Sequence, residues 1–166
     1  MNKRLIVIAE SQELRLLRNH PELGAWPVLL TGAGPDAVLR ALRDIPRDTE
    51  IVNLGFAGSQ HFSLGDEVRV DTAQFWNPVA ALPRSRTYHL AFSEGAHCYT
   101  SCDFVQGLPT TPPASVFDME LAFICALGFR KVKSYKTISD SLDYNQFKAS
   151  NPATKHENDK SLQSIL

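Results

Sequence analysis

Three acidic side chains and one glycine-rich segment lie where the chain is expected to leave a strand or enter a helix. Glu13 follows the first apolar run, Glu120 stands beside Met119, and Asp140 comes after the run Lys131–Ile138. The segment Gly55-Phe56-Ala57-Gly58 follows a third run. In open α/β sheets ligands bind beyond the carboxyl ends of the strands, where glycines let the backbone come close. Three carboxylates converging on such a crevice are suited to general acid–base chemistry.

The first third of the chain alternates between strand-like and helix-like patterns. Buried strands are predicted at Leu5–Ala9, Trp26–Leu30 and Glu50–Leu54, which are continuous apolar runs rich in β-branched residues. Leucines at helical spacing predict helices at Glu13–Arg18 and Asp36–Arg43. This alternation predicts right-handed crossovers and a parallel arrangement of the strands.

The rest of the chain is less regular. An alternating pattern at Leu64–Asp71 predicts a hairpin-like or barrel-edge strand, Phe117–Leu127 predicts an apolar helix, and Lys131–Ile138 predicts another strand. Between Trp76 and Pro113 we expect loops with one or two strands, near Tyr88–Phe92 and Tyr99–Val105, and after Pro152 a terminal helix within Asn151–Leu166. The predicted fold class is α/β: a single domain over residues 1–166 with a mixed, mostly parallel central sheet flanked by helices.

Composition restricts the possible partners. The 166 residues include 17 basic and 18 acidic side chains, so no overall field favours nucleic acid or a membrane surface. No apolar run reaches the length that crosses a bilayer. A small molecule or a second copy of the chain is the expected partner.

The cysteines give an expectation about location and metals. Cys98, Cys102 and Cys125 cannot all pair with one another, and the first residues lack a signal-peptide pattern, which favours reduced thiols in a cytoplasmic protein. His97 lies beside two of these cysteines, but no second ligand pair follows at metal-binding spacing. We therefore expect no metal and no cofactor.

Three motifs together resemble one known family. Asn53–Ser59 followed by Leu64–Val68 resembles the "N-x-G-x-A-G … x-G-D-hydrophobic" signature of the nucleoside phosphorylase / nucleosidase family. Phe117-Asp118-Met119-Glu120 is similar to the family's "D/E-M-E", and Ile138–Asp143 resembles its "R-x-I-S-D-x-x-D" strand end. The order agrees with the family from Leu5 to about Asp143, and the methylthioadenosine / adenosylhomocysteine nucleosidases are the members that the chain resembles most.

The resemblance implies roles for the three carboxylates. Asp140 matches the general acid that protonates a purine leaving group near N7, for which a raised pKa is expected; taken alone, Ser-Asp after a strand is also an ordinary helix N-cap. Glu120 matches the residue that accepts hydrogen bonds from the ribose 2′- and 3′-hydroxyls. Glu13 matches the base that activates water, and Glu10 stays an alternative because it lies nearer the strand end. Either glutamate would also favour the helix dipole.

The resemblance also implies contacts to the substrate. Ser101–Val105 resembles the family's "S-G-D-x-F-[IV]" segment shortened by one residue, in which Phe104 stacks on the purine and the Val105 backbone reads its edge. Core packing is the alternative role for Phe104. Met119 is expected against the ribose, and Ala57 and Gly58 are expected to bind substrate through the backbone.

The expected reaction is hydrolysis of the N-ribosidic bond of a purine nucleoside of the adenosine type, such as 5′-methylthioadenosine or adenosylhomocysteine, to free base and sugar. Phosphorylases carry a basic loop where this chain has Ala9–Glu13, and Phe56 replaces a small or hydroxyl residue, so water is the expected nucleophile. A purine nucleoside phosphorylase is one alternative. A catalytically reduced nucleoside-binding protein is another, because the stretch Val79–Val116 is short for the family and Lys136 stands near the usual arginine. Family members complete the sugar's 5′ pocket from a neighbouring subunit, which implies a homodimer.

Overall fold

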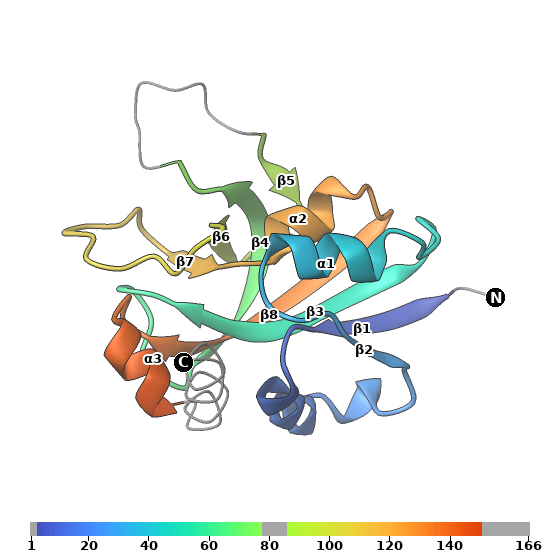
Figure 1. Cartoon of the computed structure of the whole chain (residues 1–166), viewed down its shortest axis with the longest axis horizontal. Coiled ribbons are helices and arrows are strands. Elements are labelled where there is room, and N and C mark those ends of the chain that lie inside the picture. Colours follow the sequence, from blue (N-terminus) through green and yellow to red (C-terminus); the bar gives the residue numbers. More distant parts are fainter. Residues whose placement is uncertain (1–2, 78–85, 151–166) are drawn as a thin grey trace, which may run out of the picture.

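The computed structural model describes residues 3–77 and 86–150, which form a sheet of eight strands with short helices on its faces (Figure 1). The strands are β1 (Arg4–Ile8), β2 (Val28–Leu30), β3 (Glu50–Gly58), β4 (Glu67–Phe75), β5 (Tyr88–His89), β6 (Ala96–Thr100), β7 (Ser115–Asp118) and β8 (Lys131–Asp140). The helical segments are the 3₁₀-helices η1 (Ser11–Asn19) and η2 (Pro21–Leu23) and the α-helices α1 (Pro35–Leu42), α2 (Leu121–Ala126) and α3 (Tyr144–Ser150).

Five of the strands close into a ring. β3 pairs with β8 in parallel, β8 with β4 antiparallel, β4 with β6 and β6 with β7 in parallel, and β7 returns to β3 antiparallel where Phe117 faces Gly58. β1 and β2 continue the sheet in parallel from β3, and β5 pairs with β4 antiparallel. The sheet is therefore mixed, as predicted. A strand is found where Leu64–Asp71 predicted a hairpin-like or barrel-edge strand: β4 pairs antiparallel with the next strand, β5, but it pairs on both sides, so the edge alternative is wrong.

The apolar core has two parts on the two faces of the sheet. The larger part packs side chains of α1 and α2, such as Val38 and Leu121, against strand residues such as Ile51. The smaller part packs Leu23 of η2 against Ile6 and Val52 on the opposite face. Burial of these β-branched and leucine side chains accounts for the strands predicted at Leu5–Ala9 and Glu50–Leu54.

The glycine-rich segment Gly55–Gly58 is part of a strand and not the turn that its composition predicts. β8 continues its parallel pairing with β3 through Gly55↔Lys136, Phe56↔Thr137 and Ala57↔Ile138. Each of these pairings satisfies backbone polar groups that a buried turn would leave exposed to an apolar environment. The pairing of β8 with β3 therefore continues as far as the edge of the candidate site.

The predicted helix Phe117–Leu127 is also wrong in its first half. Phe117 lies in β7, paired with Gly58 on one side and Tyr99 on the other, and α2 begins only at Leu121. Asp118 marks the change, because its carboxylate accepts a hydrogen bond from Leu121 N at 2.9 Å. Met119 and Glu120 thus lie in a sharp bend between a strand and a helix.

Other boundaries differ less. The expected helix Glu13–Arg18 is a 3₁₀-helix that begins at Ser11, the strand near Tyr88–Phe92 is limited to Tyr88–His89, and the strand near Tyr99–Val105 is Ala96–Thr100. The terminal helix expected within Asn151–Leu166 lies outside the described residues. Across the described ranges, no helix is long and apolar enough to span a bilayer.

Candidate active site

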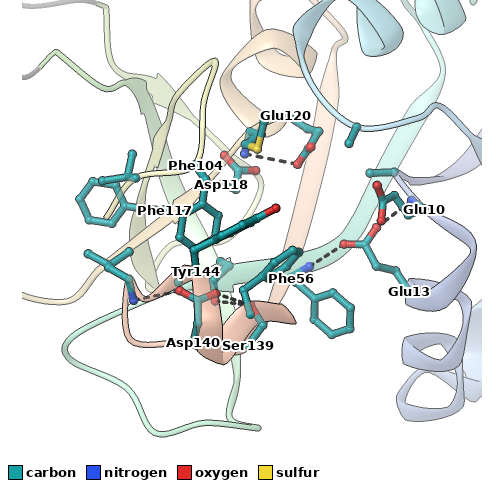
Figure 2. Close-up of a pocket in the computed structure, with 18 of the residues that line it drawn as sticks. Glu10, Glu13, Phe56, Phe104, Phe117, Asp118, Glu120, Ser139, Asp140 and Tyr144 are labelled. Atoms are coloured by element: carbon teal, nitrogen blue, oxygen red, sulfur yellow. Dashed lines mark hydrogen bonds between the residues drawn. The ribbon is translucent and has the colours of Figure 1, made fainter. Parts of the chain in front are cut away.

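A cavity of about 290 Å³ lies at the carboxyl ends of six strands. Residues that follow or end β1, β2, β3, β6, β7 and β8 line it, together with α3. This is the edge of the sheet at which α/β proteins bind ligands. Every site residue expected from the sequence lines this one cavity: Glu13, Ala57, Gly58, Phe104, Val105, Met119, Glu120 and Asp140. Figure 2 shows the carboxyl groups of Glu13, Glu120 and Asp140 on different sides of a group of aromatic rings.

Asp140 is the last residue of β8, and a β-bulge aims its side chain. The register passes from Ala57↔Ile138 directly to Gly58↔Asp140, so Ser139 is an extra residue in β8. The buried carboxylate of Asp140 accepts hydrogen bonds from Ser139 Oγ at 2.7 Å and from Leu142 N at 2.8 Å (Figure 2). Burial raises the pKa of Asp140 above its ordinary value, although these hydrogen bonds act to lower it. A carboxyl group of this kind can hold a proton and donate it.

Glu13 is buried and connects η1 to β3. One carboxylate oxygen accepts a hydrogen bond from Phe56 N at 2.8 Å, and the other accepts one from Glu10 N at 2.9 Å. Burial raises the pKa of Glu13, while these hydrogen bonds and the charge of Lys136 act to lower it. Glu10 also lines the cavity but is less buried, and its side chain accepts a hydrogen bond from Gln12.

Glu120 occupies the bend before α2, and its two oxygens are held by weak backbone contacts. Gly34 N donates to Oε1 at 3.3 Å and Met119 N donates to Oε2 at 3.4 Å. Burial, with the negative charge of Asp118, raises the pKa of Glu120 to about 8. The group therefore has unused hydrogen-bonding capacity for a ligand that enters the cavity.

An aromatic wall stands opposite these groups. Phe104 contacts two rings of α3, with ring centroids 5.2 Å from Tyr144 and 5.5 Å from Phe147. Phe56 and Phe117 add further rings to the lining. Phe104 faces the cavity and also packs against α3, so the structure gives it both a lining position and packing contacts. Rings of this kind offer a flat apolar surface on which a planar base can stack.

Several lining residues were missed by reasoning from the sequence. Tyr144 and Phe147 form an aromatic pair three residues apart on a helix just after Asp140, which was a usable signal. Asp118 was predicted only as part of a motif, yet the residue lines the cavity, and its buried carboxylate forms an ion pair with Lys136 at 2.7 Å. The alternation along β8 places Lys136 on the buried face with Ser134 and Ile138, and a buried lysine requires an acidic partner.

The described residues offer little for a metal ion. Within residues 3–77 and 86–150, no group of three His, Cys, Asp or Glu side chains is arranged to hold a metal ion. All three cysteines are free thiols; Cys98 and Cys125 are buried and Cys102 is exposed. The lining of the cavity supplies carboxyl groups, aromatic rings and backbone.

No family model matches the chain, and no curated protein sequence matches it. Solved structures do match. A Helicobacter pylori 5′-methylthioadenosine / S-adenosyl homocysteine nucleosidase is 14% identical with a TM-score of 0.69, and the alignment covers 99% of this chain and 97% of that chain. An MTAN of Chlamydia trachomatis bound to MTA is 18% identical with a TM-score of 0.66, covering 90% and 92%. The futalosine hydrolase of Helicobacter pylori is 14% identical with a TM-score of 0.69, covering 89% and 90%.

These likenesses establish the fold. The chain has the α/β fold of the nucleosidases, over nearly the full length of both partners in each comparison. The nucleoside phosphorylase-like fold that the three motifs predicted is thereby confirmed. Because the identities are low, the likeness concerns the fold, and the activity is argued from the site itself.

Proposed function

We propose that this chain is a nucleosidase that hydrolyses the N-ribosidic bond of a purine nucleoside of the adenosine type. The observation that carries the proposal is the meeting of Glu13, Glu120 and Asp140 in one cavity that also presents the ring of Phe104. The solved nucleosidases of the same fold, one of them bound to MTA, agree with this substrate class.

In the proposed reaction each group takes one step. The purine occupies the side of the cavity between Phe104 and Asp140, and Val105 lies next to its edge. As the bond between C1′ and N9 breaks, its electron pair goes to the purine, and Asp140 donates its proton to N7. The raised pKa of Asp140 is suited to this role, since the group must be protonated when it acts.

The ribose lies toward Met119 and Glu120. Its 2′- and 3′-hydroxyls donate hydrogen bonds to the Glu120 carboxyl group, whose negative charge stabilises the positive charge that develops at C1′. Glu13 takes a proton from a water molecule as the water oxygen forms its bond to C1′. Free base and free sugar are the products, and atoms and charge balance without any cofactor.

Hydrolysis is favoured over phosphorolysis by the charge of the lining. Glu10 and Glu13 stand on the side where a phosphate nucleophile would bind, and the described lining includes no lysine or arginine. Phe56 N, a backbone donor that could otherwise face an anion, is already bonded to Glu13. Phosphate would meet negative charge at this position, whereas a water molecule would meet a base.

A base-release assay on a panel of purine nucleosides, with and without phosphate, tests the proposal. We expect free adenine from adenosine-type nucleosides at the same rate in both conditions. Base release that strictly requires phosphate would show a phosphorylase. A folded protein that binds nucleosides but releases no base in either condition would show a catalytically reduced binding protein.

We further propose that one domain over residues 1–166 forms a cytoplasmic homodimer. The free thiols of the three cysteines fit a reducing compartment, and two-fold dimers are the commonest closed assemblies. Sedimentation of the active protein should give twice the mass of the chain. An active monomer would contradict the dimer and leave the proposed reaction standing.

A further inference from the structure

Lys136 is a fully buried lysine in the middle of β8. Its residue is 0% exposed, and its ammonium nitrogen lies 2.7 Å from Asp118 Oδ2. Within residues 3–77 and 86–150, no other lysine or arginine is buried. A buried charge is costly unless it is paired, so its position in the fold calls for a role.

Asp118 is held by more than the lysine. Thr100 Oγ1 donates to Oδ1 at 2.5 Å, and Leu121 N donates to Oδ2 at 2.9 Å. The hydroxyl of Thr100 in turn accepts a hydrogen bond from Ala122 N at 2.9 Å. These contacts tie β6, β7 and the start of α2 together, directly before the bend that carries Glu120.

The same ammonium group also lies near Glu13. A methyl group on Gly55 would lie 3.2 Å from Glu13 Oε1 and 3.3 Å from Lys136 Nζ, so both groups crowd the same face of this glycine. Four ionisable groups interact with Lys136 from the elements around it: Asp118 of β7, Glu120 before α2, Glu13 of η1 and the Cys98 thiol of β6. Lys136 is the only positive charge among them.

One positive charge cannot balance three carboxylates, two of which, Asp118 and Glu13, are buried. Asp118 forms the direct ion pair with Lys136. Glu13 and Glu120 interact with the same positive charge without an ion pair, and this charge acts to lower the pKa of both. Burial acts to lower the pKa of Lys136, but the charge of Asp118 raises it, and it lies above its ordinary value. The ammonium therefore stays charged, and its charge opposes the effect of burial, which raises the pKa of Glu13 and raises that of Glu120 to about 8.

We propose that Lys136, paired with Asp118, is a positioning residue whose single positive charge holds Glu13 and Glu120 toward the ionised form that their proposed roles require. The inference rests on the proposed function for its meaning, but the proton distribution itself can be measured without any turnover. An arginine at this position should serve the same role, because it also supplies one positive charge.

The direct test is a carbon-13 NMR titration of the glutamate carboxyl groups, with Glu13→Gln and Glu120→Gln used to assign the two signals. In Lys136→Met the loss of the positive charge should raise both pKa values by about 1 or more. In Asp118→Asn the unbalanced ammonium should lower both. Lys136→Arg should keep them near the wild-type values, and so should Lys133→Met, which removes a surface lysine from the same strand that pairs with Glu50.

The decisive result is that the carboxyl pKa values rise in Lys136→Met and fall in Asp118→Asn. A general loss of packing would shift these pKa values in the same direction in both variants. If Lys136→Met does not fold, Asp118→Asn and the double variant Lys136→Met with Asp118→Asn give the answer. The double variant removes one charge of each sign and should bring both pKa values back toward wild type. Unchanged carboxyl titrations in the folded variants would overturn the proposal.

Kinetics then connect the proton distribution with the reaction. The acid limb of the pH profile of kcat/KM should move to higher pH in Lys136→Met, move to lower pH in Asp118→Asn and recover in Lys136→Arg. If the wild-type protein releases no base, the proposed function fails, and the NMR titration still decides whether Lys136 controls the cluster. If base is released but the acid limb and the carboxyl titrations stay in place, only the inference about Lys136 fails.

Discussion

Gly58 and Asp140 face each other across β3 and β8, and a methyl group on Gly58 would lie 2.5 Å from Asp140 Oδ1. It would also lie 2.7 Å from Leu142 Cδ2. The bulge at Ser139 brings Asp140 into this register, and its carboxylate is held there by Ser139 and Leu142 N. The glycine thus provides the space in which the proposed acid sits.

Gly58→Ala should therefore displace the Asp140 carboxylate while the fold persists. We expect kcat/KM for base release to fall by ~10²-fold, since a misplacement of about 1 Å can have that effect on catalysis. Gly24→Ala is the control, because Gly24 lies after η2 and does not line the cavity, and a methyl group there would meet only Pro21 O at 3.3 Å. Full activity in folded Gly58→Ala would show that this close contact does not position the acid.

Asp140→Asn should separate catalysis from binding. An amide has nearly the shape of the carboxyl group but cannot supply the proton, so the base-release rate should fall by ~10²–10⁴-fold. The dissociation constant of an adenosine-type nucleoside, measured by calorimetry, should change by only a few-fold. Asp44→Asn makes the same chemical change on an exposed side chain that contacts Arg43 outside the cavity lining, and it should retain wild-type activity. An equal loss in both variants would remove Asp140 from its assigned role.

Paired variants of the two glutamates after β1 identify the base. Glu13→Gln should lower kcat by ~10²–10⁴-fold because it removes the group that takes the proton from water. Glu10→Gln should stay within a few-fold of wild type, since Glu10 reaches neither Phe56 N nor the neighbourhood of Lys136 by any contact seen in the described residues. Both rates are measured with and without phosphate. The reverse order of effects would assign the base to Glu10.

The raised pKa of Glu120 has a consequence for stability. The ordinary pKa of 4.5 in the unfolded chain rises to about 8 in the folded protein, so the folded state favours the protonated form. The stabilisation is complete below pH 4.5 and is lost as the pH rises through about 8. Glu120→Gln cannot ionise, and relative to wild type it should gain about 1 kcal/mol or more in the free energy of unfolding between pH 5 and pH 9.

Urea unfolding of both proteins at pH 5, 7 and 9 measures this difference. Glu94→Gln, a change at an exposed glutamate, should follow the wild-type pH dependence throughout. A constant difference between Glu120→Gln and wild type across the pH range would show that Glu120 does not titrate in the raised range.

The sequence predicted much of the site because its motifs carry local chemistry. Asp140, Glu120 and Glu13 were placed in one crevice, and all three line the same cavity. The pattern failed where pairing with distant strands decides the structure. Phe117 lies in an apolar run that suits a helix equally well, and only its pairing with Gly58 and Tyr99 makes it part of a strand.

For the same reason, local sequence patterns could not predict the closed ring of strands or the buried ion pair of Lys136 and Asp118. The antiparallel pairing of β4 with β8 joins residues that are far apart in the chain, and no local sequence pattern near Glu67 or Thr137 specifies this pairing. Lys136 was noticed only as a substitute for arginine, because its partner Asp118 approaches it through the fold. Tyr144 was missed although an aromatic pair at helical spacing was visible.

Paired strands and irregular segments both line the cavity, and their backbones are held to different degrees. Gly58 and Asp140 belong to strands whose amides are locked by pairing, so we expect their hydrogen exchange to follow global unfolding. Phe104 lies in the segment 101–114, which has no regular structure, and Tyr144 belongs to a helix of seven residues. Amides there should exchange through small local openings that leave β3 and β8 intact. We expect these openings to separate Phe104 from Tyr144 while Asp140 keeps its place at the end of β8.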